Sequence, residues 1–316
     1  MVLTLIFLIV FIVLALIFEW IERKLIARIQ WRVGPLLTGF KGILQPFYDF
    51  AKLLLKEETE IEGMNIYLAD FSIILYVLSS VVGLFFIPLF VSPSPYSFNE
   101  DFIIVPLTFA LSAVAQTLMG LSIQTSFTVV GTGRLVTQYA MYESLLLITL
   151  ALPFMQCNTL SMSDVVKAQS RYPTLLVQPL GFVVALIALL AKLEKPPFDL
   201  PHAKQEIAAG WMTEYCCRRL AFIQLGKDLE MVYGIALITT AFLGGGQGPM
   251  AYDFPWLYPI YFIAKMIIVL VLLVILQGMA VRVREVFMPQ RLWERGIVML
   301  VIQAFILFIL KGVGLI

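Results

Sequence analysis

Long apolar segments alternate with charged ones along almost the whole chain. A helix that crosses a bilayer needs roughly 20 mostly apolar residues, and by that criterion the pattern predicts about eight spans. The sixth is the weakest, because Lys227, Asp228 and Glu230 interrupt it, and its apolar core is expected to begin at Met231. The predicted spans lie near Val2–Phe18, Tyr67–Phe90, Phe102–Gln124, Val136–Phe154, Leu175–Leu193, Leu220–Leu243, Trp256–Val281 and Gly296–Leu310.

This pattern predicts an all-α fold, a polytopic membrane protein with a single integral membrane domain over residues 1–316. The chain is 60% hydrophobic and 14% charged, with a mean hydropathy of +0.93, whereas soluble domains carry about 25% charged residues. The N-terminus has no basic region and no small-residue cleavage site. The first segment is therefore expected to be a retained span.

The connections between the spans differ in their content of Lys and Arg, which predicts the orientation in the membrane. Two long segments, residues 19–66 and 194–219, are rich in basic residues, whereas "SPSPYSFNED" and "GGGQGPMAYDFP" contain none. The odd-numbered connections are therefore expected on the cytoplasmic side of the cell membrane, and both termini on the external side.

Patterns typical of catalytic and metal sites are missing from the sequence. Cys157, Cys216 and Cys217 are too few and too badly spaced for a disulfide framework or an iron–sulfur site. No His/Cys cluster, Ser/His/Asp set or phosphate-binding loop is visible. We expect no catalytic residue, metal site or nucleic-acid partner for this chain.

The stretch "GILQPFYDFAKLLLKEE" predicts an amphipathic helix that lies at the membrane interface. Its apolar residues, from Leu44 to Leu55, fall at helical spacing, while Asp49, Lys52 and Glu57 fall largely elsewhere. Such a helix serves as an anchor to the membrane surface, or as a platform that docks a soluble partner and lines a cavity. The sequence leaves both alternatives open.

Glu143 lies inside the fourth predicted span, in "TQYAMYESLLLITL". A carboxylate at that depth costs roughly 3 kcal/mol, so it must face protein or water. Tyr139, four residues earlier, shares its helical face, and Tyr142 adds a hydroxyl group nearby. Two interpretations stay open, a structural carboxylate paired with a buried cation and a carboxylate that relays protons.

Three lysines accompany the carboxylates of the later spans. Lys227 and Glu230 are three residues apart and are expected to meet on one helical face, with Lys265 as a further partner. Asp228 points to another side of the helix. Lys192 ends the fifth span and is expected to extend its ammonium group to the interface.

The stretch at 194–214, "EKPPFDLPHAKQEIAAGWMTE", carries unusually many charges between two apolar spans. The prolines interrupt any helix, and a short helix is expected to follow with His202 and Glu206 on one side. The acids of the stretch predict an acidic funnel beside the membrane, although a solvated proline-rich loop is the alternative. These acids are Glu194, Asp199, Glu206 and Glu214.

Several motifs together resemble the H-type membrane subunit of the respiratory complex I family, which includes related membrane-bound hydrogenases and sulfane sulfur reductases. They are "ERKLIARIQWRVGP", "GFKGILQPFYDFAKLLLKEE", "TQYAMYE", "KPPFDLPHAKQEIAAGWMTEY" and "ALITTAFLGG". The resemblance implies an eight-helix membrane fold without a redox centre of its own. It implies soluble iron–sulfur subunits and antiporter-like membrane subunits as partners, in addition to membrane lipid.

The resemblance also assigns roles to individual residues. Arg134 and Glu143 would form a pair on the fourth span, and Asp199, Glu206 and Glu214 would be the coupling acids of the funnel. We expect Glu194, Asp228 and Glu230 to take part in the same proton or ion coupling. The supporting charged network would comprise Glu22, Arg23, Arg32, Asp49, Lys52, Glu57, Tyr139, Tyr142 and Lys227.

The chain departs from the family where a quinone would bind. His202 and Lys204 stand where acids are usual, and Lys192 and Lys227 replace two further acids. These departures favour the ferredoxin-dependent membrane-bound hydrogenases and sulfane sulfur reductases, with hydrogenase-like partner subunits. The fuller "LLTGFKGILQP" segment favours the sulfur reductase branch. A quinone-site subunit of an NADH or ferredoxin:quinone oxidoreductase is the alternative, and a stand-alone solute transporter is an alternative of another class. Residues expected to modulate the acceptor site are Phe198, His202, Lys204 and Arg284.

Overall fold

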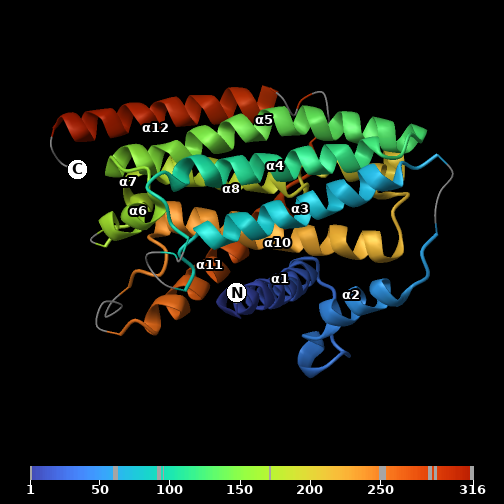
Figure 1. Ribbon diagram of the computed structural model, residues 1–316. Helices are drawn as coiled ribbons and strands as arrows, with labels where there is room; N and C mark the ends of the chain where they lie inside the picture. The colour runs from blue at the N-terminus through green and yellow to red at the C-terminus, as the bar shows by residue number, and fades with distance from the viewer. Residues whose placement is uncertain are drawn as a thin grey trace.

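The computed structural model describes residues 2–59, 63–90, 94, 96–170, 172–248, 254–283, 287 and 290–313. Within these ranges every regular element is a helix, which confirms the predicted all-α fold (Figure 1). The α-helices are α1 (Val2–Ile29), α2 (Gln45–Leu55), α3 (Ile66–Phe86), α4 (Asp101–Leu121), α5 (Ser126–Cys157), α6 (Met162–Ala168), α7 (Thr174–Val177), α8 (Pro179–Lys192), α9 (Lys204–Ile207), α10 (Cys217–Leu243), α11 (Leu257–Met279) and α12 (Arg295–Gly312). Shorter turns of helix are η1 (Phe40–Gly42), η2 (Leu200–His202), η3 (Gly210–Met212) and η5 (Gln290–Glu294).

Six helices of the described chain, namely α1, α3, α4, α5, α11 and α12, are long and apolar enough to cross a membrane. The other two predicted spans correspond to α8 and α10. With 14 residues, α8 is about 21 Å long, which is shorter than the hydrocarbon core of about 30 Å. By contrast, α10 has 27 residues, but its first half carries several charges.

The first helix continues well past the predicted end of its span. The hydropathy pattern ends near Phe18, yet α1 runs to Ile29, and the chain leaves it through a left-handed backbone at Trp31 (φ 55°). The charged residues of this extension are compatible with a helix because they find partners. Glu19 pairs with Arg23 one turn later.

The predicted amphipathic helix is confirmed as α2, with Pro46 in its first turn, where a missing N–H is tolerated. Arg23 of α1 donates a hydrogen bond of 2.8 Å to Asp49 of α2. The ring of Phe50 contacts Phe222 of α10 with 6.3 Å between centroids. These contacts attach α2 to the bundle at the end opposite α6 and α7 (Figure 1).

Helix α10 lies in the interior of the bundle and packs against α1, α2, α3 and α11 (Figure 1). Its residues from Leu229 to Phe242 are buried without interruption. Ionisable side chains at such a position are expensive unless they face protein and find partners. Glu230, which lies within this buried run, must therefore find its partners on the neighbouring helices.

Two tyrosines fix how α3 and α10 face each other. The ring of Tyr76 of α3 lies against Gly226 of α10, where an added Cβ would stand 2.5 Å from the ring. In the reverse sense, Tyr233 of α10 lies over Gly83 of α3, where a Cβ would stand 2.2 Å from the ring. No larger residue fits at either glycine without displacing a buried ring.

The loop between α8 and α10 folds into three short turns, η2, α9 and η3. The predicted short helix is present only as α9, and the expectation that it includes His202 is wrong. Ala208 and Ala209 both adopt left-handed backbone conformations, with φ of 56° and 113°. An α-helix cannot continue through such residues. His202 lies in η2 and Glu206 in α9, so the two side chains have different surroundings.

Candidate functional site

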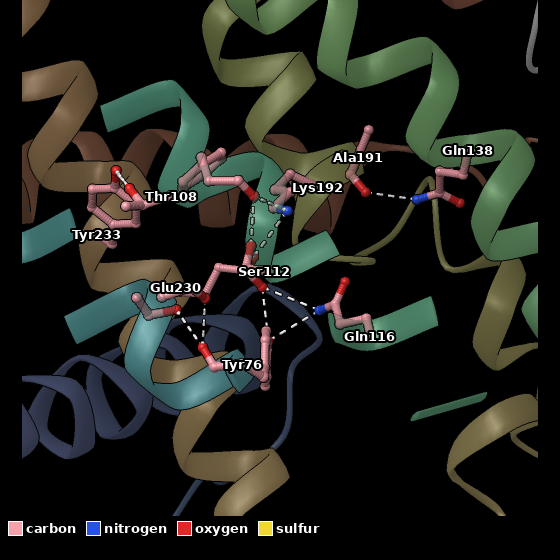
Figure 2. Close-up of polar contacts among 12 residues, drawn as sticks. Tyr76, Thr108, Ser112, Gln116, Gln138, Ala191, Lys192, Glu230 and Tyr233 are labelled. Atoms are coloured by element: carbon pink, nitrogen blue, oxygen red, sulfur yellow. Dashed lines mark hydrogen bonds and ion pairs between the residues drawn. The ribbon is translucent and has the colours of Figure 1, made fainter. Parts of the chain in front are cut away.

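Glu230 of α10 is held by donors from three other helices (Figure 2). Tyr76 of α3 donates to Oε2 at 2.7 Å, and from α4 Ser112 donates to Oε1 at 2.5 Å and Gln116 to Oε2 at 3.2 Å. Lys192 of α8 completes the set, with Nζ 3.1 Å from Oε1. Both carboxylate oxygens of Glu230 are therefore satisfied, by three hydrogen bonds and one ion pair.

Lys192 is completely buried, with 0% of its side chain exposed, against 1% for Glu230. The expectation that it extends to the interface is wrong, because the last turn of α8 ends inside the bundle. Its Nζ also donates to the Phe109 carbonyl at 2.9 Å and lies 5.0 and 5.5 Å from the ring centroids of Phe109 and Tyr142. The expected pairing of Glu230 with Lys227 is wrong for the same reason, since Lys192 occupies that position.

Lys227 instead joins a triad with Glu194 and His202. Its Nζ donates to Glu194 Oε2 at 2.8 Å and lies 2.7 Å from Nε2 of His202, which also contacts Glu194. Nδ1 of His202 is 3.1 Å from the Ala209 carbonyl, which can only accept, so Nδ1 carries a proton. Nε2 then accepts from Lys227 when the ring is neutral and donates to Glu194 when it is protonated.

The charges of this triad act strongly on Glu194. Burial by itself would raise the pKa of this carboxyl group. The positive charge of Lys227, together with that of His202 and the hydrogen bonds from both, outweighs burial and holds the pKa of Glu194 well below its ordinary value. The carboxylate therefore stays ionised between the two nitrogen bases.

A second cluster lies on the loop side of the triad, around Arg282. Its Nε is 3.1 Å from Asp199 and its Nη1 is 3.5 Å from Glu206, while Arg134 of α5 donates to Glu206 at 2.6 Å. The hydrogen bond from Arg134 lowers the pKa of Glu206, and the charge of Arg282 adds to it. Two of the predicted funnel acids thus lie together, but Arg134 pairs with Glu206 and not with Glu143 as expected.

Glu143 is nearly buried, with 8% exposed, and neither carboxylate oxygen has a hydrogen bond within the described chain. Among the charged groups near it, Lys192 attracts its carboxylate and Glu230 repels it. The neighbouring Tyr142 hydroxyl is likewise buried without a hydrogen-bond partner in this part of the chain, and its ring lies 5.9 Å from that of Tyr139. The described residues therefore form no close ion pair with Glu143.

Comparison with known proteins shows to which family the chain that carries these clusters belongs. The family model described as NADH dehydrogenase matches residues 2–309. The chain belongs to this family, the H-type membrane subunits of complex I. It is similar to the H subunit of NADH-quinone oxidoreductase from Dehalococcoides mccartyi strain CBDB1, with 34% identity over 86% of this chain and 76% of the relative. It is also similar to an H subunit of NADH-quinone oxidoreductase from Syntrophobacter fumaroxidans, with 30% identity over 84% of this chain and 81% of the relative.

The first-loop residues expected from the H-type family contribute unequally to the charged network. Glu22 pairs with Lys195, which follows α8 in the chain. Asp228 contacts the carboxyl group of Glu19 and lies within the field of Lys195. These contacts join α1, α10 and the segment that follows α8.

Other expected residues lie outside the clusters. Lys52 is 4.0 Å from Asp49, and Glu214 borders the cleft lined by Glu58 and Arg219 rather than the funnel. Arg284 lies outside the described residues. Exposed side chains for which the described chain shows no ion pair are Arg32, Glu57 and Lys204.

Phe198 occupies a structural position in the H-type loop. Its carbonyl accepts a hydrogen bond of 2.9 Å from Gln138 of α5. Its ring lines an apolar cavity of about 270 Å³ between α5, α8 and the start of α12, together with Leu145, Val184 and Met299. Within the described chain, no group of three His, Cys, Asp or Glu side chains is arranged to hold a metal ion.

Sequence reasoning missed the donors that surround Glu230. Ser112 and Gln116 are polar residues four apart in a mostly apolar span, and this spacing places both on one helical face. Tyr76 is likewise a residue with a polar group in the middle of an apolar span, α3. Polar residues that recur at helical spacing inside a span were therefore the available signal for a buried charge.

Proposed function

We propose that this chain is the membrane subunit that joins a soluble redox arm to the ion-translocating membrane arm of a complex I-like complex. The observation that carries the proposal is the succession of ionisable clusters from the loop into the bundle. It begins with Asp199, Arg282 and Glu206, continues through Glu194, His202 and Lys227, and ends at Lys192, Glu230 and Glu143. The similarity to H subunits of NADH-quinone oxidoreductase supports it.

The clusters alternate acids with bases, and this arrangement suits electrostatic coupling. When neighbouring groups interact strongly, a proton gained by one changes the preferred state of the next. A redox event beside the loop would alter the protonation of the His202 triad. The change would then pass to the carboxylates inside the bundle without movement of any redox group into this chain.

The acceptor is proposed to be sulfur or protons, with ferredoxin as the donor. Lys192, His202 and Lys227 occupy positions where quinone-using relatives are expected to carry acids, and all three are engaged in ion pairs here. Iron–sulfur and hydrogenase-like subunits would bind on the loop side, proposed to be cytoplasmic, and antiporter-like subunits within the membrane. A quinone-reducing complex is the second candidate, supported by the names of the relatives.

Isolation of the complex from its native membrane tests the proposal. The co-purifying subunits are identified, the complex is reconstituted in liposomes, and ion translocation is measured with reduced ferredoxin and sulfur, protons or a quinone as acceptor. We expect iron–sulfur and antiporter-like partners and translocation driven by sulfur or proton reduction. A chain that purifies alone and transports a solute would overturn the proposal, and translocation only with quinone would select the second candidate.

A further inference from the structure

Lys192 is one buried cation with two buried carboxylates near it, and only one of them is satisfied. Glu230 accepts three hydrogen bonds and pairs with Lys192, whereas Glu143 accepts no hydrogen bond in the described chain. The ammonium group also touches the ring of Tyr142, the residue next to Glu143 on α5, at 5.5 Å from its centroid. Its positive charge also acts on the Glu143 carboxylate.

The polar neighbours of Glu230 can also hold its protonated form when the cation leaves, because Gln116 Oε1 has no partner in the described chain and can accept from a carboxyl group. Tyr76, Ser112 and Gln116 are neutral donors anchored on α3 and α4, and none of them depends on Lys192 for its position. Glu143 has no such donors, and a buried carboxylate without hydrogen bonds requires either a proton or a cation. A mobile ammonium group would supply that cation.

We propose that Lys192 is a mobile counter-charge that alternates between Glu230, its partner in this structure, and Glu143. The carboxyl group that lacks the ammonium is the one that holds a proton, so each exchange moves one proton equivalent between α10 and α5. The proton enters from the loop side and leaves from the carboxylate that regains the ammonium. This inference rests on the proposed function and names the step by which coupling passes between the two helices.

The competing interpretation is a permanent ion pair that only holds α8 against α10. The permanent pair and the mobile cation predict different effects when both Lys192 and Glu230 are replaced by neutral residues. Replacing both partners of a buried ion pair is often tolerated, whereas removing one leaves an uncompensated charge. If the pair is static, its neutralisation leaves ion translocation unchanged. If Lys192 moves between the carboxylates, its neutralisation abolishes ion translocation.

The decisive variant is Lys192→Met combined with Glu230→Gln, since glutamine keeps groups that bond to Tyr76 and Ser112. The complete complex is reconstituted in liposomes, and the number of ions translocated per electron is measured. The matched control is Lys167→Met with Asp164→Asn, an exposed ion pair of 2.8 Å on α6. We expect the first variant to lose about ten-fold or more in ions per electron, and the control to match the native complex.

Native ions per electron in an assembled Lys192→Met/Glu230→Gln complex would overturn the inference. If this variant fails to assemble, structures of the native complex in its oxidised and reduced states decide. We expect Nζ of Lys192 within hydrogen-bond distance of Glu143 in one of them, and its retention on Glu230 in both would refute the exchange. Failure of the proposed function is distinguishable, because the native complex itself would then translocate no ions.

Discussion

The Tyr76 hydroxyl group donates a hydrogen bond of 2.7 Å to Glu230, so a phenol on α3 holds a carboxylate on α10 from 154 residues away in the chain. The same hydroxyl accepts a hydrogen bond of 3.0 Å from Gln116 on α4. The hydroxyl oxygen of Tyr76 therefore links α3, α4 and α10 and helps to fix the position of the Glu230 side chain.

Replacing Tyr76 by Phe removes this oxygen and keeps the ring over Gly226. Loss of a hydrogen bond to a charged group costs about 1.5–3 kcal/mol, so the thermal unfolding midpoint of the purified complex should fall. Tyr67→Phe on the same helix, where the side chain is 89% exposed, is the matched control and should change nothing. Equal midpoints for the two variants would contradict the role assigned to the hydroxyl group.

Lys265 of α11 closes the end of α10 by donating to the carbonyls of Leu243, Gly245 and Gln247 at 2.7, 2.9 and 2.6 Å. A cation at a helix C-terminus satisfies carbonyls that have no partner within the helix. Lys265→Met should therefore lower the free energy of unfolding by about 2–4 kcal/mol. Lys311→Met, which removes an exposed lysine from the Met155 carbonyl and Asn158, should have a smaller effect in the same thermal assay. An equal loss of stability in both variants would contradict this role.

Glu143→Gln should assemble normally, since the carboxylate makes no hydrogen bond in the described chain that glutamine would lose. Glutamine cannot exchange a proton, so ions translocated per electron should fall about ten-fold or more. Reconstituted complex carrying Asp164→Asn on the surface serves as the control. Unchanged translocation in the Glu143 variant would exclude a relay role for this residue.

Cys216 offers a test of local electrostatics outside the membrane spans. The Thr59 hydroxyl lies 2.8 Å from its sulfur and, despite partial burial, lowers the pKa of the thiol. The thiolate is the reactive form. The pH at which alkylation reaches half its maximal rate should therefore lie below about 8.5, the pKa of an unperturbed cysteine thiol. Thr59→Val should move this midpoint to higher pH, as measured by mass spectrometry of labelled peptides. Identical profiles for native and variant protein would contradict the assignment.

The hydropathy pattern was sufficient for most of the fold, because a helix that faces lipid must be apolar over its whole length. It failed where helices are surrounded by protein. The short length of α8 follows from burial inside the bundle, which hydropathy does not report, whereas the charges at the start of α10 were visible in the sequence. Ala208 and Ala209 adopt left-handed conformations that no residue preference would predict.

The site was only partly predictable. Glu143, Asp199, Glu206 and Glu230 stand out as acids in or beside apolar spans, and the structure brings Asp199 and Glu206 together through Arg282. The partners of these acids depend on which way each helix faces and where it ends. Lys192 and Glu230 are 38 positions apart by their numbers, and only the packing of α8 on α10 makes them neighbours.

The reciprocal placement of Tyr76 on Gly226 and Tyr233 on Gly83 has a mechanical consequence. A shift of α3 along α10 by one turn, about 5.4 Å, would drive both rings into backbone that carries larger side chains. Helices α3 and α10 therefore form one rigid unit. Coupling across these helices must therefore occur through changes of side-chain rotamer and through moved charges. The backbones of the two helices keep their relative position.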